Sequence, residues 1–335
     1  MKTQSRRRTH FVSRGRSLVL AGLAAALIAQ APALAQDYPN RPVTMIVPTG
    51  PGGGMELLAR ILIQQLDQRL GKPFVIENRA GASATIGTRA VARAAPDGYT
   101  LLVANSSYLA INVTLFKNLP YDPVTELTPI ALHAYSPWAL VVNPSLPVHS
   151  VTEFVKYAKS RPGELTYGSG GPGSAHNLFA EMLKSYTGID ARHIPYRGTL
   201  QPLNDVVAGH LDFMFTDLPP SLNLIKSGKV RALGVSPSRA AVAPEIPLLS
   251  ESIPGFAPLS WHMIVAPAGT PPAIINRLNS EIKNIMALPE VKRQFEEIGQ
   301  IPVDTPPPDE LKKFVKSEIV RWAEIVKQAG VAGSE

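Results

Sequence analysis

Two glycine-rich turns could bind an anion, because each follows a short apolar strand and leads directly into a helix. The first is Gly50–Gly54, and the second lies within residues 165–176, LTYGSGGPGSAH. Glycine lacks a Cβ atom, so backbone N–H groups can approach a ligand closely. The helix that follows leaves its first N–H groups without partners and carries a partial positive charge. This arrangement favours an anion. An ordinary tight connection between strand and helix is the alternative.

In the first turn, the predicted ligand-binding residues are Gly52, Gly53, Gly54 and Met55. The turn continues with Glu56, so it lacks the Gly-Lys-Ser or Gly-Lys-Thr ending of a P-loop. No G-x-G-x-x-G register fits residues 50–60 either. Both absences disfavour a nucleotide as the ligand.

The second turn adds side-chain donors to its backbone. Ser169 and Ser174 carry hydroxyl groups, and Ser174 can also cap the helix that follows. His176 lies in the first turn of this helix, where the positive helix end favours the neutral imidazole. The alternative is that Ser174 is only an N-cap and His176 only a surface residue.

Polar residues also follow two other predicted strands. Asn105 and Ser106 come after the strand at 99–104, and Asp217 comes after the strand at 211–215. In open α/β sheets, ligands bind beyond the carboxyl ends of the strands, so these residues are further candidates for the same site. For each of them, capping of the next helix is the alternative.

Catalysis and metal binding lack their usual motifs. Neither Ser169 nor Ser174 lies in a G-x-S-x-G elbow, because Tyr167 and Pro172 occupy the positions where the first glycine would be. The seven histidines form no H-x-x-x-H or H-E-x-x-H pair. The absence of cysteine excludes disulfides, thiolate catalysis and Cys-ligated zinc. We therefore expect no enzymatic activity, no metal and no cofactor.

The first 35 residues are predicted to be a cleavable secretory signal peptide. They contain six basic residues and no acidic ones, an apolar run at 18–28, and Ala33-Leu34-Ala35 before Gln36. Without those six, the net charge of +7 falls to +1. No nucleic-acid or anionic-membrane partner is therefore expected. We expect a soluble protein exported to the periplasm, by the general pathway rather than the twin-arginine pathway.

The mature chain is longer than one hydrophobic core usually supports, so two lobes are expected. Strands and helices alternate from Val43 to residue 104, which predicts a parallel sheet with helices packed on it, an α/β fold. The predicted boundaries are residues 36–139 plus 261–335 for lobe 1 and residues 140–260 for lobe 2. The chain is expected to cross between lobes near Trp138 and again near Trp261.

Short motifs along nearly the whole mature chain resemble those of the Bug/TctC family. They are Y-P-x-R-P at 38–42, V-P-x-x-P-G-G-G at 47–54, E-N-R-x-G-A at 77–82, P-D-G-Y-T at 96–100, Y-G-S at 167–169, P-Y-x-G at 195–198 and A-P-A-G-T-P at 266–271. The resemblance implies a two-lobed periplasmic-binding-protein fold, type II-like, that captures a carboxylate between its lobes. It implies a solute receptor that hands the ligand to permease subunits of a tripartite tricarboxylate transporter. We also expect the mature protein to be a monomer. An extracytoplasmic sensor that hands its ligand-bound state to a signalling partner is the alternative.

The resemblance also implies roles for residues. One ligand carboxylate is expected on Gly52–Gly54, and the cleft is expected to be lined by Asn105, Ser106, Ser169, Ser174, His176 and Asp217. Met55-Glu56 departs from the Thr-Asp of many relatives. A thioether at the mouth of the turn favours a carboxylate with an apolar or aromatic body over citrate. The alternative is that Met55 packs into its own helix.

Overall fold

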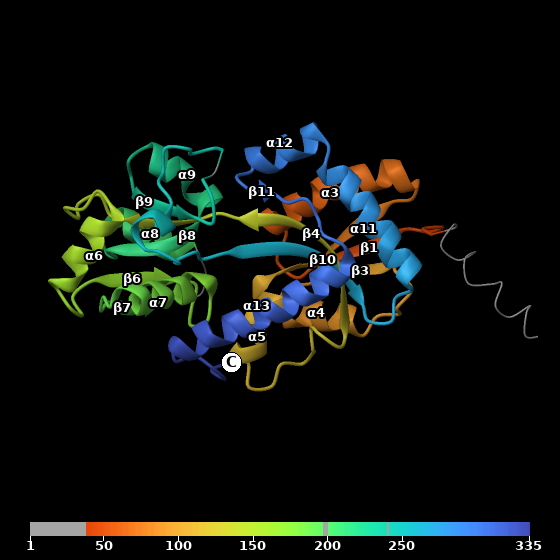
Figure 1. Ribbon diagram of the computed structural model, residues 1–335, viewed down its shortest axis with the longest axis horizontal. Coiled ribbons are helices and arrows are strands. Elements are labelled where there is room, and N and C mark those ends of the chain that lie inside the picture. The colour runs from red at the N-terminus through yellow and green to blue at the C-terminus, as the bar shows by residue number, and fades with distance from the viewer. Residues whose placement is uncertain (1–37, 197–199, 240) are drawn as a thin grey trace, which may run out of the picture. The chain divides into compact units, whose positions relative to one another are not determined.

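The computed structural model describes residues 38–196, 200–239 and 241–335 (Figure 1). The chain separates into two compact units, Met1–Asn40 and Arg41–Glu335, and every helix and strand given below belongs to the second. The predicted signal peptide lies outside the described residues, as does Gly198. Among the helices of the described ranges, none has the length and hydrophobicity needed to cross a bilayer.

The first sheet has six strands in the order β11-β4-β10-β3-β1-β2. β1 is parallel to both β2 and β3, as the alternation of strand and helix predicts. β10 is antiparallel to β3 and β4, and β11 is antiparallel to β4, so the sheet as a whole is mixed. The strands are β1 (Val43–Val47), β2 (Phe74–Asn78), β3 (Thr100–Asn105), β4 (Leu127–Ser136), β10 (Ser260–Pro267) and β11 (Ile301–Pro302).

Helices pack on this sheet through narrow apolar stripes. In the helix that follows the first glycine-rich turn, Leu58, Leu62 and Leu66 are buried at helical spacing, whereas Leu57 is 44% exposed. The helical segments are α3 (Gly54–Leu70), α4 (Thr85–Ala92), the π-helical turn η1 (Ser107–Ile111), α5 (Asn112–Leu115), α11 (Pro272–Met286), α12 (Pro289–Glu297) and α13 (Pro308–Gln328).

The second sheet has five strands in the order β7-β6-β8-β5-β9. β6 is parallel to β7 and β8, while β5 is antiparallel to β8 and β9. Its strands are β5 (Trp138–Val142), β6 (Thr166–Ser169), β7 (Arg192–Pro195), β8 (Phe213–Asp217) and β9 (Arg231–Ser236). Its helices are α6 (Val151–Lys159), α7 (Ala175–Thr187), α8 (Leu200–Ala208), α9 (Leu218–Lys226) and α10 (Leu249–Ser252).

The chain leaves the first sheet between β4 and β5 and returns to it between β9 and β10. Two sheets, each with its own helices, form the mixed α/β architecture that the sequence predicts. The exact lobe boundaries, at residues 139/140 and 260/261, stay predictions, because sheet membership alone does not define where a lobe ends.

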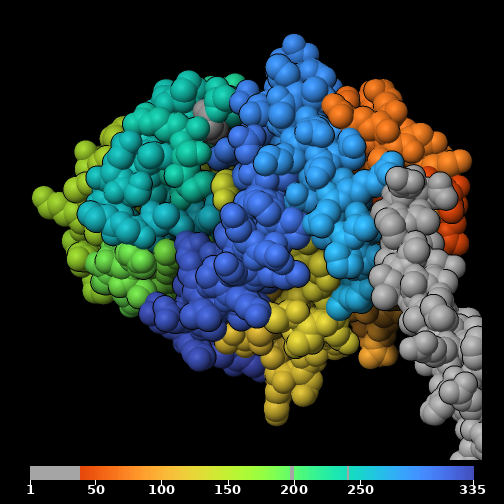
Figure 2. Space-filling view, turned by 45° about the vertical axis from the view of Figure 1, so that its right-hand side comes forward, coloured from red at the N-terminus to blue at the C-terminus, as the bar shows by residue number. Residues whose placement is uncertain are grey.

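Helix α13 connects the two sheets through buried aromatic side chains. Figure 2 shows the C-terminal helices, in blue, lying over the surface between the green elements of the second sheet and the orange α3. The rings of Trp322 on α13 and Phe179 on α7 have centroids 5.7 Å apart. At the end of α13, the Gln328 side chain accepts a hydrogen bond of 3.4 Å from Ser185 on α7. The packing of α7 therefore depends on α13.

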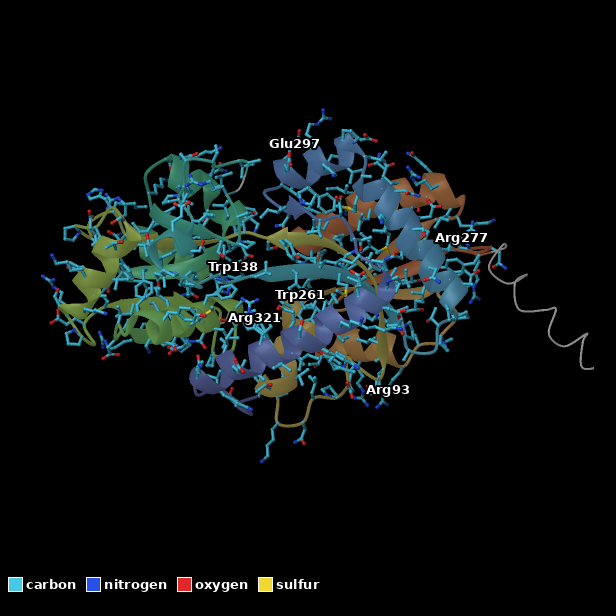
Figure 3. The ribbon with its side chains drawn as sticks, viewed as in Figure 1. Arg93, Trp138, Trp261, Arg277, Glu297 and Arg321 are labelled. Carbon is cyan, nitrogen blue, oxygen red and sulfur yellow. The ribbon has the colours of Figure 1, made fainter. Side chains whose placement is uncertain are left out.

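A buried carboxylate holds α13 against the first sheet. Glu318 Oε2 accepts the indole N–H groups of Trp261 on β10, at 2.8 Å, and of Trp322, at 3.2 Å. Arg321 donates to the other oxygen at 3.3 Å and also to the Ala257 carbonyl at 2.7 Å (Figure 3). One acidic side chain thus satisfies two indole donors that have no access to water.

Replacement of this carboxylate should destabilise the whole fold. In Glu318→Ala, two buried indole N–H groups lose their acceptor, so we expect the free energy of unfolding to fall by about 3 kcal/mol in a urea titration. The matched control is Glu324→Ala, an exposed glutamate on the same helix, which should change stability by less than about 0.5 kcal/mol. Equal effects of the two substitutions would contradict this role for Glu318.

Candidate functional site

The first candidate loop connects β1 to α3 and leaves three backbone donors open. Gly52 has a φ of +81°, which favours glycine, and Gly52–Gly54 are exposed. A Cβ atom at Gly52 or Gly54 would meet nothing within 4 Å. Gly53 is the N-cap, and its carbonyl accepts from the N–H of Glu56 at 3.0 Å. The N–H groups of Gly53, Gly54 and Met55 have no acceptor among the described residues.

Gly52 differs from the other two glycines. Its N–H donates to Glu56 Oε2 at 3.0 Å, so it is already bonded within the protein. The same oxygen accepts from Asn78 Nδ2 at 3.1 Å, and the Arg60 guanidinium donates to the other oxygen. These bonds, that from Gly52 first, hold the pKa of Glu56 below its usual range. The donors left for a ligand are therefore on Gly53, Gly54 and Met55.

The Met55 side chain does not lie open at the mouth of the loop. It is 7% exposed, so the thioether is packed within the protein and only the backbone N–H belongs to the open part of the loop. This corrects the expectation drawn from the Met55-Glu56 departure. The preference for an apolar or aromatic ligand loses its basis.

The polar residues after β3 hold local structure. Asn105 Oδ1 accepts from the N–H groups of Ser107 and Tyr108, at 3.0 and 3.2 Å, and so caps η1. Ser106 is buried, and its hydroxyl shares a 3.0 Å hydrogen bond with Ser260 on β10. The capping alternative describes the contacts of Asn105, and Ser106 bonds within the sheet.

The second candidate loop connects β6 to α7, and its serine hydroxyls are bonded within it. Ser169 Oγ accepts from the N–H of Gly171 at 3.0 Å and lies 2.6 Å from His193 Nε2. Ser174 is the N-cap of α7, and its hydroxyl also donates to the Gly171 carbonyl at 2.7 Å. The N–H groups of Ala175 and His176 have no acceptor among the described residues. Here too, the open donors are backbone groups of the first helical turn.

The close Ser169–His193 pair is not arranged for nucleophilic catalysis. Ser169 is fully buried, so a substrate carbonyl cannot reach its oxygen. The imidazole of His193 stacks on Tyr167 with ring centroids 4.9 Å apart, which fixes it beneath the loop. The pair therefore supports the loop from below.

His176 and Asp217 are brought together by the second sheet. Asp217 ends β8, which is parallel to β6, so it lies at the same sheet edge as Ser169. His176 Nε2 is 3.9 Å from Asp217 Oδ2, and its ring meets that of Trp138 edge-on at 4.9 Å. Burial lowers the pKa of His176 to about 4, so the imidazole is neutral.

Asp217 is the acidic side chain of this group that water can reach. It occupies the N-cap position of α9 but makes no side-chain capping bond, so the capping alternative does not describe it. Its side chain is 38% exposed, yet desolvation by the surrounding protein raises its pKa to about 6. An accessible carboxyl group without a capping bond is available to a ligand.

The loop of the second sheet also approaches the helices of the first. A Cβ atom at Gly173, whose φ is +72°, would lie 2.3 Å from Leu115 Cδ1 on α5. A second close approach joins Gly299 and Pro219, where a Cβ at the glycine would be 2.8 Å from the proline ring. Segments that belong to different sheets are thus in contact at two places.

Three residues that contact the candidate site were not predicted from the sequence to belong to it. Trp138 is 3% exposed and contacts His176, and its Nε1 has no acceptor among the described residues. Asn78 and His193 hold the first and the second loop, respectively. Asn78 stood in the E-N-R-x-G-A motif, but the motif itself gave no sign of what its side chain bonds to.

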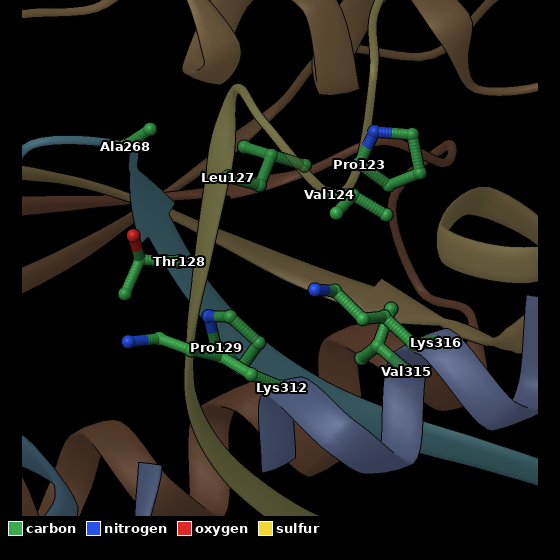
Figure 4. Close-up of a pocket in the computed structure, with 9 residues that line it drawn as sticks. All are labelled: Pro123, Val124, Leu127, Thr128, Pro129, Ala268, Lys312, Val315 and Lys316. Carbon is green, nitrogen blue, oxygen red and sulfur yellow. The ribbon is translucent and has the colours of Figure 1, made fainter. Parts of the chain in front are cut away.

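A separate hollow of about 150 Å³ lies away from these loops (Figure 4). On β10, His262 pairs with Asn105 near the loops, whereas Pro267 pairs with Leu127 at the other end of the strand, where the hollow is. The hollow is lined by Pro123, Val124, Leu127, Thr128, Pro129, Ala268, Lys312, Val315 and Lys316.

No group of three or more His, Asp or Glu side chains in the described part of the chain could hold a metal ion.

The fold and the paired loops define a class of protein, the two-lobed periplasmic solute-binding proteins. The model of the tripartite tricarboxylate transporter family receptor, TctC, matches residues 58–331. The chain belongs to this family. Its members are ligand-binding receptors and not enzymes, which agrees with the expected absence of catalysis.

Individual relatives agree with this assignment. Protein BugT of Bordetella pertussis is 38% identical over 303 residues, which cover 90% of this chain and 93% of BugT. A solved structure of R. palustris Rpa4515 with adipate is 35% identical with a TM-score of 0.79, and the match covers 88% of this chain and 99% of that one. The periplasmic binding protein BugD is 33% identical with a TM-score of 0.74 and the same coverage.

The raised pKa of Asp217 can be measured directly. We expect its carboxyl carbon, assigned by its loss in Asp217→Asn, to titrate near pH 6 in an NMR experiment, against about 4 for an ordinary aspartate. Because the pKa is raised, ionisation of Asp217 is less favourable in the folded protein than in the unfolded chain and so lowers stability. This loss of stability is absent below about pH 4, grows between about pH 4 and pH 6, and is complete above about pH 6. Stability should therefore fall as pH rises through this window, and Asp217→Asn should remove that slope. A midpoint at or below pH 4 would show that desolvation does not raise the pKa of this carboxyl group.

Proposed function

We propose that this protein captures a small carboxylate between its two lobes and delivers it to the permease subunits of a tripartite transporter. The observation that carries the proposal is the exposed loop before α3, whose three N–H donors on Gly53, Gly54 and Met55 have no acceptor among the described residues. The adipate in the Rpa4515 structure supports a carboxylate as the ligand class. Export to the periplasm by the predicted signal peptide, and a monomeric state, are part of the same proposal.

The donors of the first loop suit one end of the ligand. Their N–H groups form the first turn of a 17-residue helix, so the positive end of its dipole adds to the hydrogen bonds. No lysine or arginine is required, and the ligand carboxylate exchanges water for directed backbone donors. Glycines keep the approach open because side chains do not occupy the space above them.

The second loop suits the other end of the ligand. Ala175 and His176 offer N–H groups at the start of α7, and Asp217 offers an acceptor beside the neutral His176. With a pKa of about 6, Asp217 is mostly ionised at pH 7 and repels a second ionised carboxylate placed against it. A hydroxyl or ammonium group of the ligand, or a carboxylate that shares a proton with Asp217, would suit this position.

Capture requires no covalent step. The ligand carboxylate docks on the first loop, and the second loop then closes over it. In this scheme the affinity depends on the fraction of protein able to close, so substitutions near Trp138 or Trp261 can weaken binding without a ligand contact. The closed form is the state that the permease subunits recognise.

A screen of carboxylates tests the proposed ligand class. Mono-, di- and tricarboxylates, aliphatic and aromatic, should be tested by thermal shift and then by calorimetry on the purified mature protein. A ligand at 100 times its dissociation constant should stabilise the fold by about 2.7 kcal/mol. If no carboxylate shifts the transition and none gives binding heat, the proposed ligand class is wrong.

A substitution at Gly53 tests the loop itself. Gly53 has φ −81° and ψ 165°, an extended conformation that valine adopts readily, and the nearest atom to an added Cβ is the Gly50 carbonyl oxygen at 3.9 Å. Gly53→Val should therefore fold normally while its side chain fills the space proposed for the ligand. We expect the dissociation constant to rise by at least about 100-fold, with a smaller rise for Gly53→Ala. Unchanged affinity in Gly53→Val would mean that the loop is only a connector.

A further inference from the structure

The glycines of the loop before α3 have no side chains that could fix their conformation. Gly50, Gly52 and Gly54 lack Cβ atoms, and none of the three would place one against another part of the protein. Glycine also loses the most conformational freedom on ordering. Free donors bind an anion well only if they are already oriented, because any ordering on binding subtracts from the affinity. Something other than side-chain packing must hold this loop.

The contacts of Glu56 provide that support. Its side chain is 4% exposed and lies in the first turn of α3. Oε2 accepts from the N–H of Gly52 at 3.0 Å and from Asn78 Nδ2 at 3.1 Å, and Oε1 accepts from Arg60 Nε at 2.9 Å. Asn78 Nδ2 also donates to the Thr49 carbonyl at 3.1 Å. Asn78, the last residue of β2, therefore bonds to Thr49 before the glycines and to Glu56 after them. Glu56 in turn holds Gly52 among the glycines.

The position of the bond to Gly52 decides which donors stay open. In a capping box, the acidic residue at the third helical position accepts the N–H of the N-cap residue itself. Here Glu56 is the third residue of α3 and Gly53 is the N-cap, yet the carboxylate accepts from Gly52, one residue earlier. The N–H of the N-cap is therefore left free. A conventional capping box would have used the Gly53 donor and left only those of Gly54 and Met55.

The charge of Glu56 is compatible with an anion beside it. The Arg60 guanidinium, 64% exposed, forms an ion pair with Oε1 and offsets the negative charge. Hydrogen bonds from Gly52 and Asn78 engage the other oxygen. Both oxygens are hydrogen-bonded within the protein, so repulsion of a ligand carboxylate is reduced.

From these contacts we infer that Glu56 and Asn78 are positioning residues, which hold the loop so that Gly53, Gly54 and Met55 present their N–H groups to the ligand. The inference rests on the proposed function of this loop. Met55-Glu56 stands where many relatives have Thr-Asp, and the inference assigns a new role to Glu56 at this place. Its carboxylate shapes the loop and does not contact the ligand.

Binding measurements on four proteins test the inference: wild type, Glu56→Ala, Asn78→Ala and Asn279→Ala. For a carboxylate found in the screen, we expect Glu56→Ala to raise the dissociation constant at least about tenfold, and Asn78→Ala to raise it by a smaller factor. Asn279 on α11 is a buried amide whose side chain donates to the carbonyls of Ile130 and Pro306 and not to the loop, so Asn279→Ala controls for loss of stability and should leave the constant unchanged. Equal affinity of Glu56→Ala and wild type, or equal weakening in Asn279→Ala, would overturn the inference.

An NMR signature separates positioning from general stability. In the wild type, the Gly52 amide proton should resonate downfield, as a donor to a carboxylate, and should shift little on ligand addition, while Gly53, Gly54 and Met55 shift strongly. In Glu56→Ala the Gly52 resonance should move upfield, and Glu56→Gln, which keeps one acceptor oxygen, should restore part of the downfield position. A Gly52 resonance identical in wild type and Glu56→Ala would refute the bond on which the inference depends.

The same spectra distinguish the two proposals. If the wild type binds no carboxylate, the proposed function fails. The positioning of Gly52 is still tested in the ligand-free protein by its amide resonance. If the wild type binds and Glu56→Ala binds equally well, the function stands and the positioning role is wrong.

Discussion

Backbone N–H groups in the first turn of a helix have no acceptor within that helix, and this constraint shapes both candidate loops. In most helices a side chain of the protein takes up some of these donors. At the start of α3 no side chain does so at Gly53, and at the start of α7 the Ser174 hydroxyl accepts only from Asn177. Both helices therefore begin with unused donors, beyond the carboxyl ends of strands β1 and β6. Nearby side chains keep these helix starts in place and leave the donors free.

Three carboxyl groups show how hydrogen bonding and solvent access decide a role. Glu56 and Glu318 are buried, and each accepts from several donors, so their charges are stabilised by the protein. Asp217 is accessible to solvent but accepts no capping bond, and desolvation raises its pKa to about 6. The first two hold structure because their hydrogen-bonding capacity is used. Asp217 makes no such capping bond, so its oxygens are available to the ligand that we propose.

The sequence predicted elements and loops well, because their signals are local. The β1–turn–α3 and β6–turn–α7 units follow from apolar runs, glycines and helical spacing, and both are present. Side-chain direction within the first helical turn was not predictable. Met55 and Glu56 are neighbours and both are buried, and only the structure gives the bond from Glu56 back to Gly52. The hydroxyls of Ser169 and Ser174 were expected to face a ligand, but their bonds within the loop depend on His193 and Gly171.

The pairing of strands that lie far apart in the sequence could not be predicted either. The antiparallel pairing of β4 with β10 joins residues more than 120 positions apart, and alternation of neighbouring elements carries no information about it. Two lobes were expected from the length of the mature chain, but the periplasmic-binding-protein topology came from the resemblance to a family. Family motifs therefore supplied the topology, whereas the residues themselves supplied the local units.

Movement of the second loop is constrained by the aromatic side chains behind it. His176 contacts Trp138, Trp138 contacts Phe179, and Phe179 contacts Trp322 on α13. Trp322 and Trp261 donate to the same carboxylate of Glu318, which fixes α13 to β10. A rearrangement that brings the start of α7 toward the first loop must either carry this cluster along as a unit or separate Phe179 from Trp322. Separation would expose two large buried rings to water, so movement that keeps the α7–α13 contact intact has the lower cost.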